Sequence, residues 1–231
     1  MKKVGIIGGI GPASTLDYYS GIINKYRVKA NDENYPEIII NSINMTEMLT
    51  YVSNKDWSSL TNMLLKAIKS LSDAGADFAA IASNTPHIVF DMVKEMSVLP
   101  LISIVLETCK YAKLKGCKKV VVIGTRFTMS NGFYRDAFER HGITAVVPSE
   151  AEQETIHNLF FPNLENGIVI PEDKQNMLKI LSGLVDEHHA DAIVLGCTEL
   201  PLMIKTGDVD TLLLDTTQIH IDAIVNYISE G

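Results

Sequence analysis

A cysteine stands where a short apolar stretch of this sequence ends. Residues 192–195 are apolar and strand-forming, and Gly196, Cys197, Thr198 and Glu199 come directly after them. A continuous apolar run of this length is typical of a buried parallel strand. Ligands of open α/β sheets bind beyond the carboxyl ends of the strands, so this cysteine stands where chemistry usually takes place. The other interpretation is structural, because free cysteines often only fill space in a core.

A second stretch has the same layout, with a hydroxyl in place of the thiol. A stretch at residues 76–82, apolar except for Asp77, is followed by Ser83, Asn84 and Thr85, so Ser83 matches Cys197 in position. Asn84 and Thr85 could simply cap the helix predicted after them. A helix beginning at Thr198 would lower the pKa of the Cys197 thiol from about 8.5 toward neutrality. His87, one turn after Ser83, could polarise the serine hydroxyl or serve only as a surface or capping group.

Alternating strands and helices must position these groups, and they predict an α/β fold with parallel sheets. The layout occurs twice, since Gly8 precedes Ser83 by 75 positions and Gly124 precedes Cys197 by 73. We therefore expect two pseudo-symmetric α/β domains, residues 1–97 with 210–231 and residues 98–209, with an active site in the cleft between them. The strands are predicted at 3–7, 37–43, 77–82, 99–102, 119–123, 143–147, 192–195 and 212–214. The helices are predicted at 14–29, 56–74, from 86 onward, 104–114, 130–140, 150–159, 172–188 and 218–228.

The composition and charge of the chain argue against some classes of binding partner. The 231 residues are 46% hydrophobic and carry a formal charge of −8, which argues against a nucleic-acid or anionic membrane partner. Cys109, Cys117 and Cys197 show neither zinc spacing nor a C-x-x-C pair, which favours free thiols in a reducing cytoplasm. No apolar segment approaches the ~18 residues that span a bilayer. The pattern implies no metal.

A glycine-rich turn comes after the first predicted strand. Residues 9–14 resemble the G-x-G-x-x-G fingerprint of dinucleotide-binding proteins, with Ser14 in the last place. The second strand ends in Asn41 and Asn44 rather than in the acidic residue that a ribose requires. We therefore interpret the turn as a backbone N–H cradle for a carboxylate.

Four segments together resemble the aspartate/glutamate racemase family over nearly the whole chain: 8–12 (GGIGP), 83–87 (SNTPH), 124–129 (GTRFTM) and 196–199 (GCTE). The resemblance implies a cofactor-independent amino-acid racemase, cytoplasmic and homodimeric, with L-aspartate or L-glutamate as substrate. It implies that Cys197 and Ser83 exchange the Cα proton on opposite faces of the substrate. The substrate-binding residues that it implies are Ile10, Asn84, Thr85, Thr125, Thr128, Thr198 and Glu199.

Two departures from the family keep alternatives open. Ser83 replaces the family's first cysteine, and a hydroxyl is a poorer base than a thiolate. Met48 and Glu165 stand where some aspartate racemases carry basic side-chain clamps. A one-cysteine decarboxylase of the arylmalonate type is therefore one alternative. A catalytically weak protein that binds a small dicarboxylate is another.

Overall fold

A computed structural model describes residues 1–30, 33–164 and 167–230 of the chain. The chain forms two compact units: Met1–Glu107 with the C-terminal segment from Thr217, and Thr108–Thr216. The domain bounds expected above, 1–97 with 210–231 and 98–209, stay a prediction. Each unit holds one four-stranded parallel sheet with helices around it, which confirms the predicted α/β class.

The sheet of the first unit has the strand order β2-β1-β3-β4. Its strands are β1 (Val4–Gly8), β2 (Ile38–Ser42), β3 (Phe78–Ile81) and β4 (Leu101–Ile102). The helices of this unit are α1 (Pro12–Ala30), α2 (Met45–Ser53), α3 (Trp57–Asp73), the 3-10 helix η1 (Thr85–Val89), α4 (Phe90–Met96) and α11 (Thr216–Ser229). The register pairs Ile7 with Ile81, so the loops after β1 and β3 leave the sheet at the same edge.

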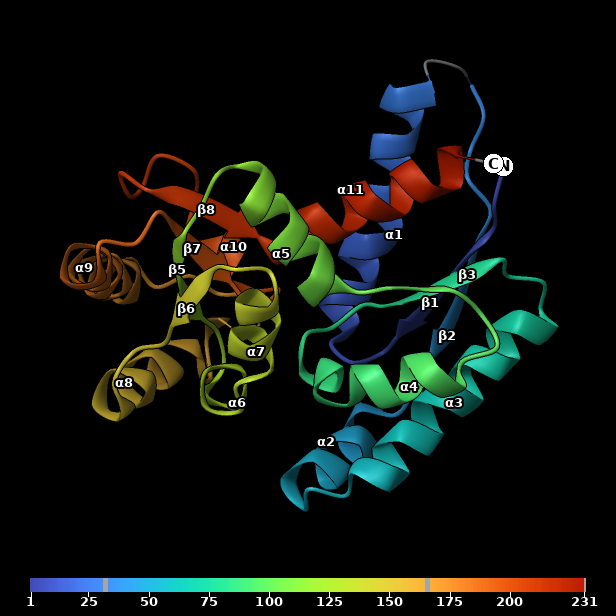
Figure 1. Ribbon diagram of the computed structural model, residues 1–231, viewed down its shortest axis with the longest axis horizontal. Coiled ribbons are helices and arrows are strands. Elements are labelled where there is room, and N and C mark those ends of the chain that lie inside the picture. The colour runs from blue at the N-terminus through green and yellow to red at the C-terminus, as the bar shows by residue number, and fades with distance from the viewer. Residues whose placement is uncertain (31–32, 165–166, 231) are drawn as a thin grey trace. The chain divides into compact units, whose positions relative to one another are not determined.

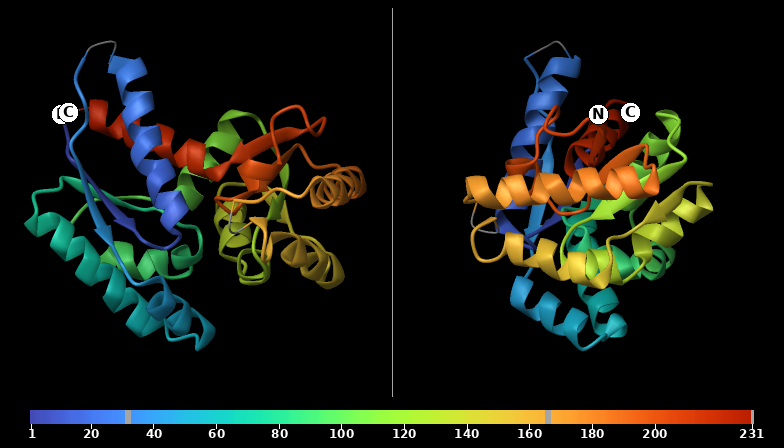
Figure 2. Two further views of the ribbon diagram at one scale, coloured as in Figure 1. Left: turned by 180° about the vertical axis from the view of Figure 1, so that it is seen from behind. Right: turned by 90° about the vertical axis from the view of Figure 1, so that its left-hand side faces the viewer.

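Strand alternation decides which helices cover each face of this sheet. Val4 and Ile6 of β1 share one buried cluster with Phe78 and Ala80 of β3 and with apolar residues of α1 and α11. Gly5 faces the other way, toward Leu71 of α3. Figures 1 and 2 show the result: α1 and α11 lie on one face of the sheet and α3 on the other. Successive side chains of a strand point to opposite faces, as this arrangement requires.

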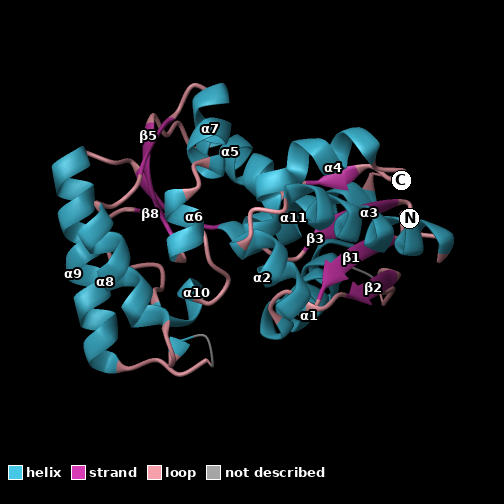
Figure 3. Cartoon of the chain, turned by 90° about the horizontal axis from the view of Figure 1, so that it is seen from below, coloured by secondary structure: helices cyan, strands magenta, loops and turns pink. Residues whose placement is uncertain are grey.

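The sheet of the second unit repeats the order as β6-β5-β7-β8. Its strands are β5 (Lys119–Ile123), β6 (Thr144–Val146), β7 (Ala192–Leu195) and β8 (Leu212–Asp215). Its helices are α6 (Arg126–Ser130), α7 (Phe133–Arg140), α8 (Glu150–Phe160), α9 (Pro171–His188) and α10 (Leu200–Met203), and α5 (Ile104–Leu114) enters it from the first unit. Apolar residues of α8, α9 and α10 pack on one face of β5 and β7. Figure 3 shows α8 and α9 on that face and α5 and α7 on the other.

Several element boundaries differ from the predictions. Helix α1 begins at Pro12, because Ser14 and Thr15 use their hydroxyls on Ala82 O and Gly11 O rather than as caps. The single helix expected at 130–140 is two, α6 and α7, separated at Gly132, whose φ of 70° is left-handed. The helix expected at Thr198 begins at Leu200 and is four residues long. None of the described helices is both long and apolar enough to cross a membrane.

Candidate active site

Cys197 lies at the carboxyl end of β7, partly exposed, and its thiol is held by a carboxylate. The Cys197 Sγ–H donates to Glu199 Oε2 at 2.9 Å, and the Thr198 hydroxyl donates to the same oxygen at 2.9 Å. The thiol and the Thr198 hydroxyl thus share one carboxylate oxygen as acceptor. The arrangement offers the thiol a proton acceptor within direct reach.

This environment raises the pKa of Cys197 well above its usual range. Desolvation is the largest cause, followed by the negative charge of Glu199 and the hydrogen bond to that carboxylate. The backbone N–H groups of Glu199 and Thr198 act in the opposite direction, because they favour the thiolate. The lowering expected from a helix beginning at Thr198 is therefore wrong: α10 is too short and begins too late, and the nearest charge is negative.

Two threonines that follow β5 lie beside the end of β7 and are linked to it by a hydrogen bond. Thr125 caps α6 and accepts from the Thr128 backbone N–H, and the two hydroxyl oxygens are 3.3 Å apart. The Thr128 hydroxyl donates to Gly196 O at 3.5 Å, which joins the loop after β5 to the loop after β7. A Cβ on Gly196 would lie 2.8 Å from Ile123 O, so only glycine fits where these loops meet. The structure thus brings Thr125, Thr128, Cys197, Thr198 and Glu199 into one connected group.

In the first unit, Ser83 comes after β3 and is partly exposed, and His87 holds it through the backbone. His87 Nδ1 lies 3.0 Å from Ser83 O, so this nitrogen carries the proton and donates to the carbonyl. The hypothesis that His87 polarises the Ser83 hydroxyl is therefore wrong, because the ring binds the carbonyl instead. His87 is buried and stacks on Phe90 at 5.0 Å between ring centroids. Burial lowers its pKa to about 4, so the ring is neutral at pH 7.

Asn84 is buried and Thr85 is partly exposed at the start of η1. The Asn84 side chain makes no cap hydrogen bond to η1, which removes the simplest structural role proposed for it. Ser14 of α1 donates to Ala82 O at 3.0 Å and thereby ties α1 to the end of β3.

The glycine turn after β1 completes the strand-end group of the first unit. Gly9 has a φ of 83°, and a Cβ there would lie 2.5 Å from Ile43 O. The Gly9 N–H donates to Thr15 Oγ1 at 2.9 Å and is not available to a ligand. In the described part of the chain the N–H groups of Ile10 and Gly11 have no acceptor, so they are the ones that could hold a carboxylate.

The sequence alone assigned no role at the site to Ser14 or Thr15. Thr15 fixes the glycine turn and Ser14 fixes the end of β3, and the position of two hydroxyl residues just after the glycines was the signal that could have indicated this. Met48, which the resemblance places near a basic clamp of some aspartate racemases, is only 2% exposed, so its side chain belongs to the core. Glu165, the second such position, lies outside the described residues. Within those residues, no three His, Cys, Asp or Glu side chains gather as a metal site requires.

Comparisons with known proteins agree with this layout. A sequence model of the Asp/Glu/Hydantoin racemase family matches residues 7–224. The broad specificity amino-acid racemase RacX of Bacillus subtilis (strain 168) is 25% identical over 225 residues, 93% of this chain and 92% of that protein. Glutamate racemase of Aquifex aeolicus (strain VF5) is 29% identical over 183 residues, 76% of this chain and 66% of that protein. An aspartate racemase homologue from Pyrococcus horikoshii OT3 has a solved structure that is 37% identical, with a TM-score of 0.89, covering 99% of this chain and 100% of that one.

Proposed function

Because the chain belongs to the Asp/Glu/Hydantoin racemase family, we propose that it racemises free α-amino acids without a cofactor, using Cys197 and Ser83. The observation that carries the proposal is the thiol of Cys197 hydrogen-bonded to Glu199 at a parallel strand end. Proton removal from Cα needs a base, and Cys197 can supply one as a thiolate once its proton passes to the carboxylate that accepts its hydrogen bond.

The proton moves in a balanced cycle on the Cys197 face. Glu199 takes the thiol proton, which leaves a thiolate stabilised by the N–H groups of Thr198 and Glu199. The thiolate then removes the Cα proton, and the electron pair of the broken C–H bond passes into the α-carboxylate as an enolate. Reprotonation of Cα from the opposite face gives the other enantiomer. Ser83 supplies that proton from its hydroxyl and takes one back from solvent. Glu199 releases the thiol proton to solvent, which returns all three groups to their starting state.

The α-carboxylate carries the developing charge, so hydrogen-bond donors must surround it. The candidates are the free N–H groups of Ile10 and Gly11 and the polar side chains of the two strand-end groups. Those side chains are Asn84, Thr85, Thr125, Thr128 and Thr198. Glu199 is engaged by Cys197 and Thr198, which supports a role as proton acceptor more than as a substrate contact.

Aspartate and glutamate are the proposed substrates, on the strength of the family. The buried side chain of Met48 offers no positive charge to an acidic side chain, so the selectivity for them is expected to be weak. The name of the Bacillus subtilis relative describes a broad specificity, and a wide substrate range in this chain would agree with that.

Solvent deuterium exchange tests the assignment. The purified protein is incubated in D₂O with each of a panel of L-amino acids, and deuterium at Cα and D-product are both measured. Cys197→Ala is expected to abolish both, whereas Cys117→Ala, which changes a buried thiol of the same unit, is expected to leave them near normal. Normal exchange in Cys197→Ala would remove Cys197 from the mechanism.

Ser83→Cys tests the opposite face. A second thiol should preserve or raise turnover and make the rates from the two enantiomers more equal, because both faces then have an acid of similar strength. Exchange of the wild-type protein with one enantiomer only, unchanged by Ser83→Cys, would contradict the role given to Ser83.

A further inference from the structure

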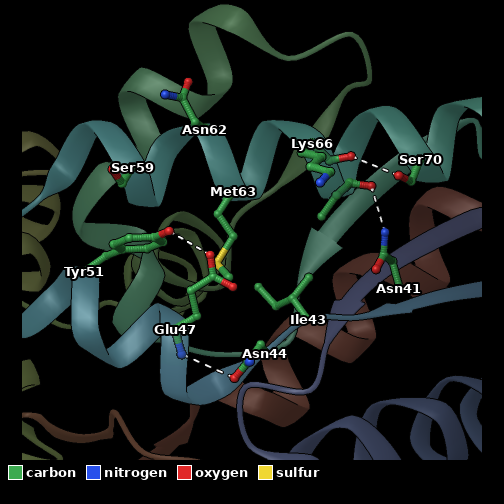
Figure 4. A pocket seen from close by; sticks show the side chains of 11 residues that line it. Asn41, Ile43, Asn44, Glu47, Tyr51, Ser59, Asn62, Met63, Lys66 and Ser70 are labelled. Atoms are coloured by element: carbon green, nitrogen blue, oxygen red, sulfur yellow. Dashed lines mark hydrogen bonds between the residues drawn. The ribbon is translucent and has the colours of Figure 1, made fainter.

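A polar pocket lies in the first unit next to the glycine turn, since its lining residue Ile43 donates its N–H to Gly8 O at 3.0 Å. It is formed by the end of β2, by α2 and by α3, and its volume is about 530 Å³. Figure 4 shows the side chains that line it. They are Asn41, Ile43, Asn44, Glu47, Tyr51, Ser59, Asn62, Met63, Lys66, Ala67 and Ser70. None of them is among the residues assigned to racemisation.

One side of this pocket is acidic. Glu47 and Tyr51 lie one turn apart on α2, and the Tyr51 hydroxyl donates to Glu47 Oε1 at 2.7 Å. This hydrogen bond is the largest cause of the raised pKa of Tyr51, so the phenol stays protonated and keeps the carboxylate oriented. Among the described residues no Lys, Arg or His nitrogen lies within 4.0 Å of the Glu47 carboxylate. Glu47 therefore presents an oriented negative charge without a cation.

The other side is basic. Lys66 of α3 lines the pocket, and its ammonium group has no acceptor among the described residues. Lys69, three positions further along the helix, behaves differently, because it pairs with Asp73 and does not line the pocket. Asn41 donates its amide to Ala67 O at 3.4 Å, which fixes a further polar group near Lys66. Figure 4 shows Glu47 with Tyr51 at one side of the pocket and Lys66 with Asn41 at the other.

Both residues are exposed to solvent, and their carboxylate and ammonium groups face one cavity without pairing with each other. A ligand that satisfies both must carry a positive and a negative group a short distance apart. A phosphate or nucleotide would be repelled by Glu47, and a divalent cation would be repelled by Lys66. Ile43 and Met63 add apolar surface to the lining, which suits a small side chain. Small-ligand pockets commonly enclose about 300–1,000 Å³, so the size is also appropriate.

We propose that this pocket is a second binding site for a free α-amino acid in its zwitterionic form. The ammonium group of the ligand binds Glu47, and its carboxylate binds Lys66. A bound ligand bridges α2 to α3. Since α2 also buries Met48 in the core, the bridge braces that part of the first unit.

The site can be located directly by NMR. The ¹⁵N-labelled protein is titrated with glycine, L-alanine, L-valine and L-glutamate while backbone amide shifts are followed. Saturable shifts are expected in residues 43–51 and 59–70, with a dependence on concentration distinct from any shifts at 83–87 and 196–199. N-acetyl amino acids and amino-acid amides, which each lack one charge, should fail to shift the amides of the pocket.

Matched substitutions complete the test. Lys66→Met and Glu47→Gln should each weaken binding at the pocket about tenfold or more, as loss of one charge-assisted hydrogen bond predicts, and leave turnover unchanged. Lys69→Met and Glu95→Gln change exposed residues outside the pocket and should alter neither. Shifts confined to 83–87 and 196–199, or equal effects of Lys66→Met and Lys69→Met, would overturn the proposal. Glycylglycine is the remaining arm: if it shifts the pocket amides and no free amino acid does, the ligand is a peptide and the amino-acid assignment is wrong.

Discussion

Two buried histidines should make the first unit labile to mild acid. His220 donates from Nε2 to Ile102 O at 3.0 Å and accepts from the Tyr18 hydroxyl at Nδ1, 2.7 Å away. His87 donates from Nδ1 to Ser83 O and has no partner at Nε2. Protonation of His220 would therefore place a new N–H against the Tyr18 hydroxyl, and protonation of His87 would create an N–H that has no acceptor.

Burial is the largest cause of the lowered pKa in both rings, about 4 for His87 and about 3 for His220, and the proximity of His87 adds to it for His220. The folded pKa lies below the unfolded value of about 6.5, so the neutral rings contribute stability that is present above pH 6.5 and lost as pH falls toward the folded values. From pH 7 to pH 5 each ring should cost about 2 kcal/mol, or about 4 kcal/mol for the pair. This magnitude hardly depends on the folded pKa, because both rings are still mostly neutral in the folded protein at pH 5.

The assay is urea unfolding at pH 7 and pH 5, followed by tryptophan fluorescence. The sequence contains one tryptophan, Trp57, which begins α3 in the same unit as both histidines. The double variant His87→Gln/His220→Gln keeps donors to Ser83 O and Ile102 O but cannot titrate. It should be less stable at pH 7 and lose about 4 kcal/mol less than the wild type between the two pH values. His188→Gln, in the second unit, is the control and should leave the difference unchanged. If the double variant loses as much stability as the wild type, other groups cause the acid lability and the reasoning fails.

Three further predictions concern the second unit and the reaction. Glu199→Gln should lower the pKa of Cys197, because it removes the nearby negative charge, so alkylation by iodoacetamide at pH 8 should become faster while Cα exchange slows; slower alkylation would contradict the pKa argument. Gly196→Ala should destabilise the second unit by roughly 1–3 kcal/mol, because the new Cβ would be overpacked against Ile123 O and Thr128. Urea unfolding measures the loss. Gly183→Ala is the control, since a Cβ at Gly183 meets nothing within 4 Å. Incubation with a disubstituted malonate should release no CO₂; release without amino-acid racemisation would favour the one-cysteine decarboxylase.

The sequence predicted the sheets well because buried parallel strands leave a strong signal. The runs at 119–123 and 192–195 match β5 and β7 residue for residue, since a strand covered on both faces is apolar wherever it is buried and only Lys119 at the start of β5 is not. The boundaries of helices were harder. Helix α2 is absent from the predicted helices. It buries only Met48 and Val52, so its apolar periodicity is weak, although the Asn44 side chain caps its first turn. The break between α6 and α7 falls at Asn131-Gly132, a residue pair typical of turns.

The candidate site was predictable in its residue types but not in its electrostatics. The strand-end positions of Cys197 and Ser83 can be derived from where apolar runs stop. The direction of the Cys197 pKa cannot, because it depends on whether the Glu199 carboxylate turns back to the sulfur or out to solvent. Likewise, the spacing of His87 and Ser83 fits a bond to the hydroxyl or to the carbonyl, and the backbone of η1 decides for the carbonyl.

The first unit combines residues 1–107 with α11, which is translated more than 100 residues later, and this has a consequence for synthesis on the ribosome. Ile221, Ile224, Val225 and Ile228 of α11 fill the cluster that α1, β1 and β3 share, and Lys2 N–H donates to Ile228 O at 3.3 Å. Figure 2 shows the two ends of the chain together. The second unit lies wholly within residues 108–216, so its core needs none of these four residues. The first unit therefore cannot complete its core until residues 217–230 have been made, and until then α1 leaves Ile22 and its neighbours uncovered.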